Sequence, residues 1–164
     1  MITLVLGGAR SGKSEIAEQL VARLPAPVVY LATLTASGDE DLAARIAMHV
    51  ERRPSDWKTV EAGADLINAI QEEPGATILV DSLGPWVSAH DDFVTDTDGL
   101  VAAVRAHRGP IVLVSEEVGM SVHPSTADGR TFRDALGRVN RAVAEAADDV
   151  LLAVAGRVLR LDRP

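Results

Sequence analysis

Residues 2–14 of the chain have the sequence ITLVLGGARSGKS, a short apolar run followed by a glycine-rich stretch. The apolar run, residues 2–6, is rich in aliphatic and β-branched side chains and predicts a buried strand. Residues 7–14 match the phosphate-loop pattern G-x-x-x-x-G-K-[ST], and Ser14 opens a segment with helical spacing. A glycine-rich turn could match this pattern by chance, but the flanking strand and helix favour a nucleotide-binding loop.

The chemistry of such a loop follows from its backbone. Glycine lets the chain wrap closely around phosphates, and successive N–H groups at a helix N-terminus form an anion site. Lys13 is expected to reach the β- and γ-phosphates of ATP or GTP, and the Ser14 hydroxyl to ligate Mg²⁺. The expected nucleotide contacts in the loop are Gly7, Gly8, Ala9, Arg10, Ser11, Gly12, Lys13 and Ser14.

Beyond the loop, short apolar runs alternate with stretches of helical period. This alternation predicts an α/β fold of the P-loop NTPase type, with a mostly parallel sheet flanked by helices. Strands are expected at residues 2–6, 27–32, 58–60, 77–80, 111–114, 150–154 and 158–161, and helices at 14–24, 39–51, 64–71, 99–106 and 130–147. Gly156, between the last two strands, predicts an antiparallel edge hairpin at the C-terminal end. With no repeat and no linker in the sequence, residues 1–164 are interpreted as one domain.

A phosphate loop also needs a carboxylate at the end of a neighbouring core strand to hold the metal. Asp81 follows the run TILV and is the first candidate. The competing interpretation makes Asp81 only the N-cap of the segment after Ser82. Glu116 and Glu117 follow the run IVLVS and are the second-choice carboxylates, because ligands gather at the carboxyl edge of open α/β sheets.

Composition limits the classes of protein that remain. The formal net charge of −8 argues against binding to nucleic acid or to an anionic membrane surface. The chain has no cysteine, which excludes disulfides and cysteine nucleophiles. No apolar run approaches the roughly 20 residues that a membrane-spanning helix needs, and no signal peptide is expected. We therefore expect a cytoplasmic protein.

His49 stands in a basic stretch, with Arg45 one turn before it and Arg52 and Arg53 after it. An imidazole can attack phosphorus, and neighbouring guanidinium groups can neutralise phosphate charge. Spacing alone leaves a second interpretation open, because a single helical histidine is more often a solvated surface residue. The other histidines are interpreted as structural or loop residues: His90, His107 and His123.

Several motifs occur together and in a fixed order. They are GGARSGKS (7–14), YLAT (30–33), ARI..H...RP (44–54), VDS (80–82), EVGM (117–120) and FRDALGRVN (132–140). In this combination the chain resembles, nearly end to end, the bifunctional adenosylcobinamide kinase and adenosylcobinamide-phosphate guanylyltransferase family of cobalamin biosynthesis. The phosphate-loop motif alone would not indicate a particular family, whereas the ordered set of motifs is specific to this one.

The resemblance implies two reactions. The first moves the γ-phosphoryl group of ATP or GTP to the aminopropanol hydroxyl of adenosylcobinamide. The second moves GMP from GTP to that phosphate through a GMP-histidine intermediate, which gives adenosylcobinamide-GDP and pyrophosphate. The position of the Arg45-Ile46 pair implies that His49 is the histidine that carries GMP, and Lys13 is expected to act with it in catalysis.

The resemblance also implies further contacts and an assembly. Nucleotide contacts outside the phosphate loop are expected from Ala32, Thr33, Leu34, Val50, Glu51, Arg52, Arg53, Glu61 and Asp81. Mg²⁺ is expected on Ser14 and Asp81, and a homotrimer is expected with active sites near the subunit contacts. The partners are then ATP, GTP and the corrinoid, with no nucleic acid and no membrane segment.

Three positions depart from the family pattern: Glu116 stands where asparagine is usual, Ser121 where glycine is usual, and Arg141 where glutamine is frequent. The stretch between Asp81 and the IVLV strand is also shorter than usual. No general base for the kinase step can be identified from the sequence. Two other functions remain open, a small-molecule P-loop kinase in which His49 takes no part and a regulator that binds GTP without transferring it.

Overall fold

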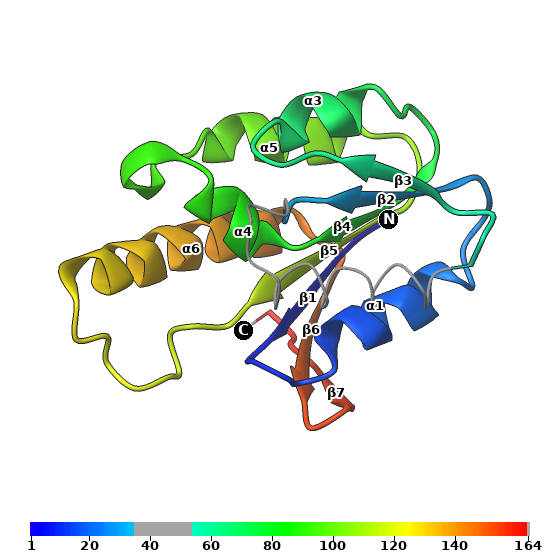
Figure 1. Cartoon of the computed structure of the whole chain (residues 1–164). Helices are drawn as coiled ribbons and strands as arrows, with labels where there is room; N and C mark the ends of the chain where they lie inside the picture. Colours follow the sequence, from blue (N-terminus) through cyan, green and yellow to red (C-terminus); the bar gives the residue numbers. More distant parts are fainter. Residues whose placement is uncertain (35–53, 164) are drawn as a thin grey trace.

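A seven-stranded sheet, in the order β3-β2-β4-β5-β1-β6-β7, runs through the part of the chain that the structure describes (Figure 1). The structure is a computed structural model, and it describes residues 1–34 and 54–163. The strands are β1 (Ile2–Gly7), β2 (Val28–Ala32), β3 (Lys58–Glu61), β4 (Thr77–Asp81), β5 (Ile111–Glu116), β6 (Asp149–Val154) and β7 (Arg157–Arg160). The helices are α1 (Lys13–Val21), α3 (Leu66–Gln71), α4 (Leu83–Ser88), the 3-10 turn η1 (Asp91–Phe93), α5 (Thr97–Ala106) and α6 (Ala127–Ala146).

All the strand pairs are parallel except β6–β7, which is antiparallel and closes one edge of the sheet. The central strand β1 pairs with β5 on one side and β6 on the other, so the strand that leads into the phosphate loop has neighbours on both sides. Because the strands are parallel, their carboxyl ends meet at one edge of the sheet. Ligands collect at this edge in open α/β sheets.

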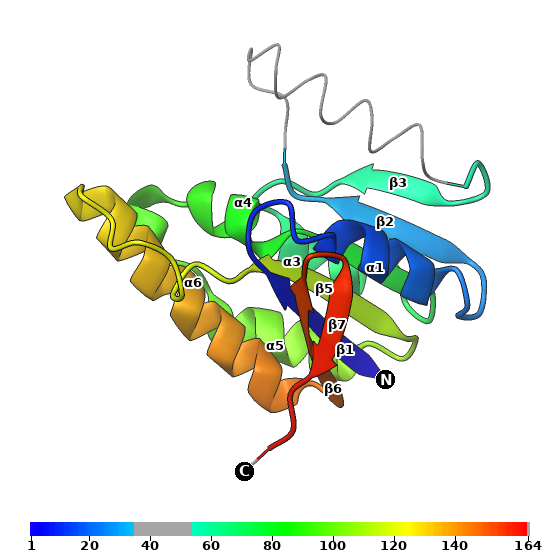
Figure 2. The same cartoon turned by 90° about the horizontal axis from the view of Figure 1, so that it is seen from below.

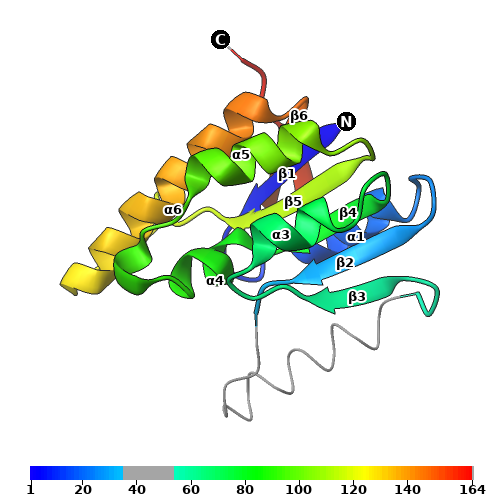
Figure 3. The ribbon, with the colours of Figure 1, turned by 90° about the horizontal axis from the view of Figure 1, so that it is seen from above.

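Helices cover both faces of the sheet. Figure 3 shows α3, α4, α5 and α6 on one face, with α1 on the other. Successive residues of a strand point to opposite faces. In β1, Leu4 and Leu6 therefore join the core under α3 to α6, while Val5 joins the core under α1 with Ala17 and Val21. Burial on both faces explains why the strands are continuous apolar runs rather than alternating ones.

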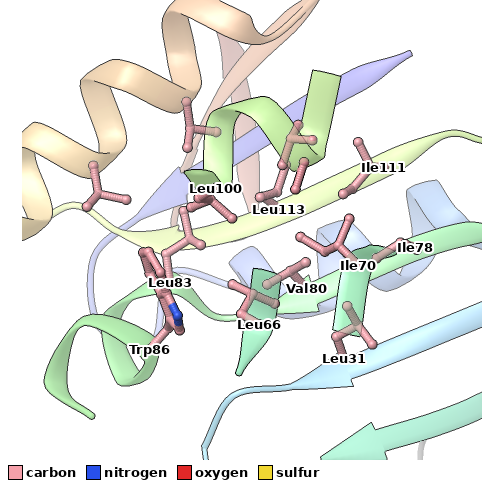
Figure 4. Packing of buried hydrophobic residues seen from close by; sticks show 14 of the residues in the cluster. Leu31, Leu66, Ile70, Ile78, Val80, Leu83, Trp86, Leu100, Ile111 and Leu113 are labelled. Atoms are coloured by element: carbon pink, nitrogen blue, oxygen red, sulfur yellow. The ribbon is translucent and has the colours of Figure 1, made fainter. Parts of the chain in front are cut away.

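The larger core lies between the sheet and α3 to α6 (Figure 4). Trp86 of α4 is 1% exposed, and its ring nitrogen donates to the carbonyl of Ala64 at 3.1 Å. The same core contains aliphatic side chains from strands and helices, including Leu31, Leu66, Ile70, Ile78, Val80, Leu83, Leu100, Ile111 and Leu113. With so few aromatic residues in the chain, branched aliphatic side chains make up most of this core.

The predicted α/β fold is confirmed, including the mostly parallel sheet and the edge hairpin at Gly156. Among the described residues, the bounds of the predicted helices differ from expectation by up to three residues; α1, for example, ends at Val21 rather than at residue 24. Helix α6 begins at Ala127 rather than at residue 130, because the Thr126 side chain caps it by accepting from the Gly129 amide. Helix α4 was not predicted as a separate helix, since Gly84 and Pro85 in its first turn mask the helical signal. The helix expected at 39–51 lies outside the described residues.

Asn140 of α6 ties this helix to the end of β5. It is 6% exposed, accepts from the Ser115 hydroxyl at 2.6 Å, and donates through Nδ2 to the Glu116 carbonyl at 3.0 Å. A buried polar group is costly unless it is hydrogen-bonded. Asn140 therefore fixes the backbone at the carboxyl end of β5, next to the phosphate loop.

We expect Asn140→Ala to lower the free energy of unfolding by about 2–3 kcal/mol, because the buried Ser115 hydroxyl and the part-buried Glu116 carbonyl lose their hydrogen bonds. Urea denaturation measures this change. Arg141→Ala is the matched control: Arg141 is the next residue, its side chain is 84% exposed, and it forms a surface ion pair with Glu145. That pair contributes no more than about 0.5 kcal/mol. Equal losses in the two variants would contradict the anchoring role of Asn140.

Within the described residues, no helix is both long enough and apolar enough to cross a lipid bilayer.

Candidate functional site

The phosphate loop joins β1 to α1 at the carboxyl edge of the sheet. Gly12 adopts φ +88°, a left-handed conformation that favours glycine, and it precedes the first residue of α1. The N-cap residue of this helix, Gly12, has no side chain with which to cap it. The first-turn N–H groups of α1 consequently lack the partner that a capping side chain supplies, which suits them to bind an anion.

The β6–β7 hairpin supports the phosphate loop from the side (Figure 2). The Gly156 amide at the tip of the hairpin donates to the Ser11 carbonyl at 2.9 Å. A Cβ added to Gly12 would lie 3.3 Å from the Cα of Gly156, so the two glycines permit a close approach of their backbones. The hydroxyl of Ser11 is buried and has no hydrogen-bond partner among the described residues.

Lys13, the first residue of α1, points toward the end of β5. Its Nζ lies 3.5 Å from Oε1 of Glu116, and the two side chains are 13% and 28% exposed. Glu116 is further held by the Ser82 hydroxyl, which donates to Oε1 at 2.8 Å, and by the Gly84 amide, which donates to Oε2 at 3.0 Å. The lysine and this carboxylate therefore form a partly buried pair beside the loop.

Asp81, the last residue of β4, faces the start of α1. Its Oδ1 accepts from the Ser14 hydroxyl at 3.1 Å, and its Oδ2 accepts from the Tyr30 hydroxyl at 2.6 Å. The interpretation of Asp81 as an N-cap is wrong, because Ser82 is the residue at the N-cap of α4 and the Asp81 carboxylate turns to Ser14 instead.

The pair Ser14 and Asp81 fits a magnesium ion by the chemistry of its donors. A hydroxyl and a carboxylate oxygen stand next to each other, and Mg²⁺ binds oxygen ligands of this kind with one or two protein groups plus substrate phosphates. Of the second-choice carboxylates, Glu116 lies beside Lys13. Glu117 instead accepts from the amides of Gly119 and Met120 in its own loop, at 2.6 and 3.1 Å.

The carboxyl ends of β2 and β3 bring other predicted contacts to the same edge. Ala32 is in register with Asp81 on one side and with the exposed Glu61 on the other. Thr33 is 2% exposed, and its hydroxyl donates to the Ser82 carbonyl at 2.5 Å and accepts from the Ser82 amide at 2.9 Å. Thr33 thus fixes the backbone after Asp81, and Leu34, which follows it, is half-buried.

The predicted catalytic histidine, His49, lies outside the described residues, as do the expected nucleotide contacts Val50, Glu51, Arg52 and Arg53. The remaining histidines contact their own scaffold. A ring nitrogen of His90 lies 2.8 Å from the Trp86 carbonyl, one of His107 lies 2.8 Å from the Ala76 carbonyl, and one of His123 lies 3.0 Å from Arg133. These contacts agree with the interpretation of His90, His107 and His123 as structural or loop residues.

The contact of Tyr30 with Asp81 was not predicted from the sequence. Tyr30 is 2% exposed in the middle of β2, and a buried tyrosine hydroxyl usually has a hydrogen-bond partner. A single tyrosine in a predicted core strand was therefore a usable signal for a polar group nearby. The identity of that partner depends on the adjacency of β2 and β4, which the sequence pattern alone does not give.

Comparison with known proteins adds an independent line of evidence. The sequence model of the family described as cobinamide kinase / cobinamide phosphate guanyltransferase matches residues 3–161. The bifunctional adenosylcobalamin biosynthesis protein CobP of Pseudomonas aeruginosa is 38% identical over an alignment of 164 positions that covers 95% of this chain and 94% of CobP. The corresponding CobU proteins of Salmonella typhimurium and Escherichia coli are each 37% identical, over 95% of this chain and 97% of their own length.

Solved structures with a similar fold are distant in sequence. An ATPase of the type III secretion system of pathogenic bacteria superposes with a TM-score of 0.54 at 12% identity, over 92% of this chain but only 50% of the ATPase. A Pyrococcus horikoshii protein, PH0250, superposes with a TM-score of 0.51 at 10% identity, over 97% of this chain and 84% of that protein. At these identities the likeness concerns the fold alone.

Proposed function

Because the chain belongs to the cobinamide kinase / cobinamide phosphate guanyltransferase family, we propose that it phosphorylates adenosylcobinamide and then transfers GMP to the product. Membership makes the chain a transferase of adenosylcobalamin biosynthesis. The observation that carries the proposal is the cluster of Lys13, Ser14 and Asp81 where β1 and β4 end. These three side chains are the ones that a phosphate loop uses on a magnesium nucleotide.

In the first reaction, the hydroxyl oxygen of adenosylcobinamide attacks the γ-phosphorus of ATP or GTP. The bond from the γ-phosphorus to the β–γ bridging oxygen breaks, the nucleoside diphosphate leaves, and the hydroxyl proton is released. The first-turn amides of α1 bind the phosphates, and Lys13 offsets the negative charge on the β- and γ-phosphates. Ser14 and Asp81 would hold Mg²⁺, which supplies further charge neutralisation at the phosphates when it is bound.

In the second reaction, a nitrogen of His49 attacks the α-phosphorus of GTP, and the bond to the β-phosphate oxygen breaks to release pyrophosphate. The phosphate oxygen of adenosylcobinamide phosphate then attacks the same phosphorus. This step frees the imidazole and gives adenosylcobinamide-GDP. A covalent intermediate divides one difficult displacement into two easier ones. Arg52 and Arg53 are suited to neutralise the triphosphate near His49.

Two experiments test the function. Incubation of the protein with ATP, GTP and adenosylcobinamide should give adenosylcobinamide phosphate and then adenosylcobinamide-GDP, both followed by mass spectrometry. Incubation with labelled GTP alone should give an acid-labile protein adduct that is heavier by one GMP group. A small-molecule kinase would stop at the phosphate and form no adduct, and a GTP-binding regulator would form no corrinoid product at all.

The Tyr30→Phe variant tests the magnesium site. The aromatic ring and its packing remain, but the Asp81 carboxylate loses the hydroxyl that orients its Oδ2. We expect the Mg²⁺ concentration for half-maximal kinase activity to rise about tenfold, since residues that orient a metal ligand have effects of this size. The measurement is a magnesium titration of turnover at a fixed nucleotide concentration.

Two more variants are compared with Tyr30→Phe, one expected to have a larger effect and one expected to have none. Asp81→Asn should shift the magnesium titration further than Tyr30→Phe, whereas Asp91→Asn, which changes an exposed carboxylate in η1, should not shift it. An unchanged magnesium dependence in Asp81→Asn would contradict the assignment of Asp81 as the carboxylate at the metal.

Several finer expectations from the sequence stay predictions. They are the homotrimer with active sites near subunit contacts, the cytoplasmic location, and nucleotide contacts from Ala32, Thr33, Leu34, Glu61 and the stretch from Val50 through Glu51 to Arg53. The support for the contacts at the ends of β2 and β3 is their position in register with Asp81.

A further inference from the structure

Glu116 places a negative charge beside the group that is expected to bind phosphate. Its Oε1 is 3.5 Å from Nζ of Lys13, and both side chains are largely shielded from solvent. The residue is in register with Gly7, the first residue of the phosphate loop, so backbone and side chain both bring it to that loop. Screening by salt is weak at such a partly buried position.

The carboxylate is held in place from two sides. The Ser82 hydroxyl and the Gly84 amide donate to its two oxygens, and Asn140 donates to its backbone carbonyl. These donors belong to the start of α4 and to α6, not to the phosphate loop. Movement of Lys13 toward a bound phosphate would therefore leave Glu116 where it is.

One ammonium group then has to serve two negative partners. Without nucleotide, Lys13 and Glu116 neutralise each other. With a triphosphate in the loop, Lys13 turns to the β- and γ-phosphates, and the fixed carboxylate of Glu116 faces the phosphates without its own counter-charge. Like charges at short range in a partly buried site repel strongly. A divalent cation beside Ser14 and Asp81 offsets this repulsion.

We propose that Glu116 makes triphosphate binding depend on a divalent cation, so that the site selects the magnesium nucleotide over the free nucleotide. Glu116 acts here as a specificity-determining residue through the charge that it adds beside Lys13. The inference rests on the proposed function, because it takes the phosphate loop to be the nucleotide site.

The test is a binding measurement that needs no turnover. The ligand is guanosine 5′-[α,β-methylene]triphosphate, whose α–β bond cannot be cleaved, and no corrinoid is present to accept the γ-phosphoryl group. Calorimetry gives its dissociation constant once with excess Mg²⁺ and once with EDTA. The dissociation constant in EDTA divided by the dissociation constant with Mg²⁺ measures the coupling between cation and nucleotide.

Glu116→Gln is the informative variant, because glutamine keeps the size of the side chain and an oxygen that can accept from Ser82 or Gly84. Glu117→Gln is the matched control, since Glu117 is the next residue and bonds to Gly119 and Met120 in its own loop. Thermal unfolding of each variant checks that the fold is retained.

In Glu116→Gln we expect the ratio to fall about tenfold, within the range typical of coupling between two ligands, mainly through tighter binding in EDTA. Glu117→Gln should keep the wild-type ratio. An unchanged ratio in Glu116→Gln, or an equal loss of affinity with and without Mg²⁺, overturns the proposal. The wild-type measurement with Mg²⁺ separates failure of this inference from failure of the proposed nucleotide site. If the wild type binds but the Glu116→Gln ratio is unchanged, only the role of Glu116 is overturned. If the wild type does not bind at all, the phosphate loop is not the nucleotide site.

Discussion

Lys13→Ala is expected to lower turnover of both reactions by at least about a hundredfold, the cost typical of removing one charge-stabilising donor from an active site. In the proposed function both reactions start from a nucleoside triphosphate in the same loop, so a single substitution should affect both. The Lys13 side chain is 13% exposed, so water can replace it only poorly. Initial rates of adenosylcobinamide phosphate and adenosylcobinamide-GDP formation, measured separately, give the two losses.

Lys58→Ala provides the comparison for Lys13. Lys58 opens the edge strand β3, is 60% exposed and pairs with Glu73, away from the phosphate loop. Its removal should leave both rates near the wild-type value. Full kinase turnover in Lys13→Ala would refute the assignment of residues 7–14 as the phosphate site. Because the substitution also leaves Glu116 without its ion-pair partner, urea denaturation should accompany the kinetics.

His49→Ala should separate the two activities. We expect guanylyl transfer to fall by about a thousandfold or more, the scale seen when a covalent nucleophile is removed. The kinase reaction uses the corrinoid hydroxyl as nucleophile and should persist, so adenosylcobinamide phosphate should accumulate. The labelled adduct formed with GTP should disappear in the same variant. Mass spectrometry of the intact protein and of the corrinoid products measures both effects.

His123→Ala is the control for His49, because His123 is an exposed loop histidine. It should keep the GTP adduct and both activities. A GMP adduct that survives in His49→Ala would place the intermediate on another residue. Loss of kinase turnover together with guanylyl transfer would mean that His49 supports the shared nucleotide site rather than acting as the nucleophile.

The parts of the site that lie close together in the sequence could be predicted from it. The run of residues 2–14 contains the strand, the glycines, Lys13 and Ser14, so a local pattern was sufficient. Asp81 was the first candidate for the metal carboxylate, because ligands gather where parallel strands end, although the sequence left its interpretation as an N-cap open. The same periodicity located the strands of the sheet, since continuous apolar runs of this length are typical of strands buried on both faces.

The parts that depend on strand order could not be predicted in this way. Tyr30 meets Asp81 because β2 lies next to β4, and Glu116 meets Lys13 because β5 lies between β4 and β1. The apolar pattern of a strand does not determine which strands lie beside it in the sheet. Glu116 and Glu117 were therefore equivalent candidates in the sequence. Only the direction of their side chains distinguishes them, and that direction is set by Ser82, Gly84 and Asn140.

The central place of β1 has a consequence for how the protein is made. Both edges of this strand are taken by β5 and β6, and the Ser11 carbonyl of the phosphate loop accepts from Gly156. During synthesis, the backbone contact between the Ser11 carbonyl and the Gly156 amide can therefore form only after Gly156 has been made.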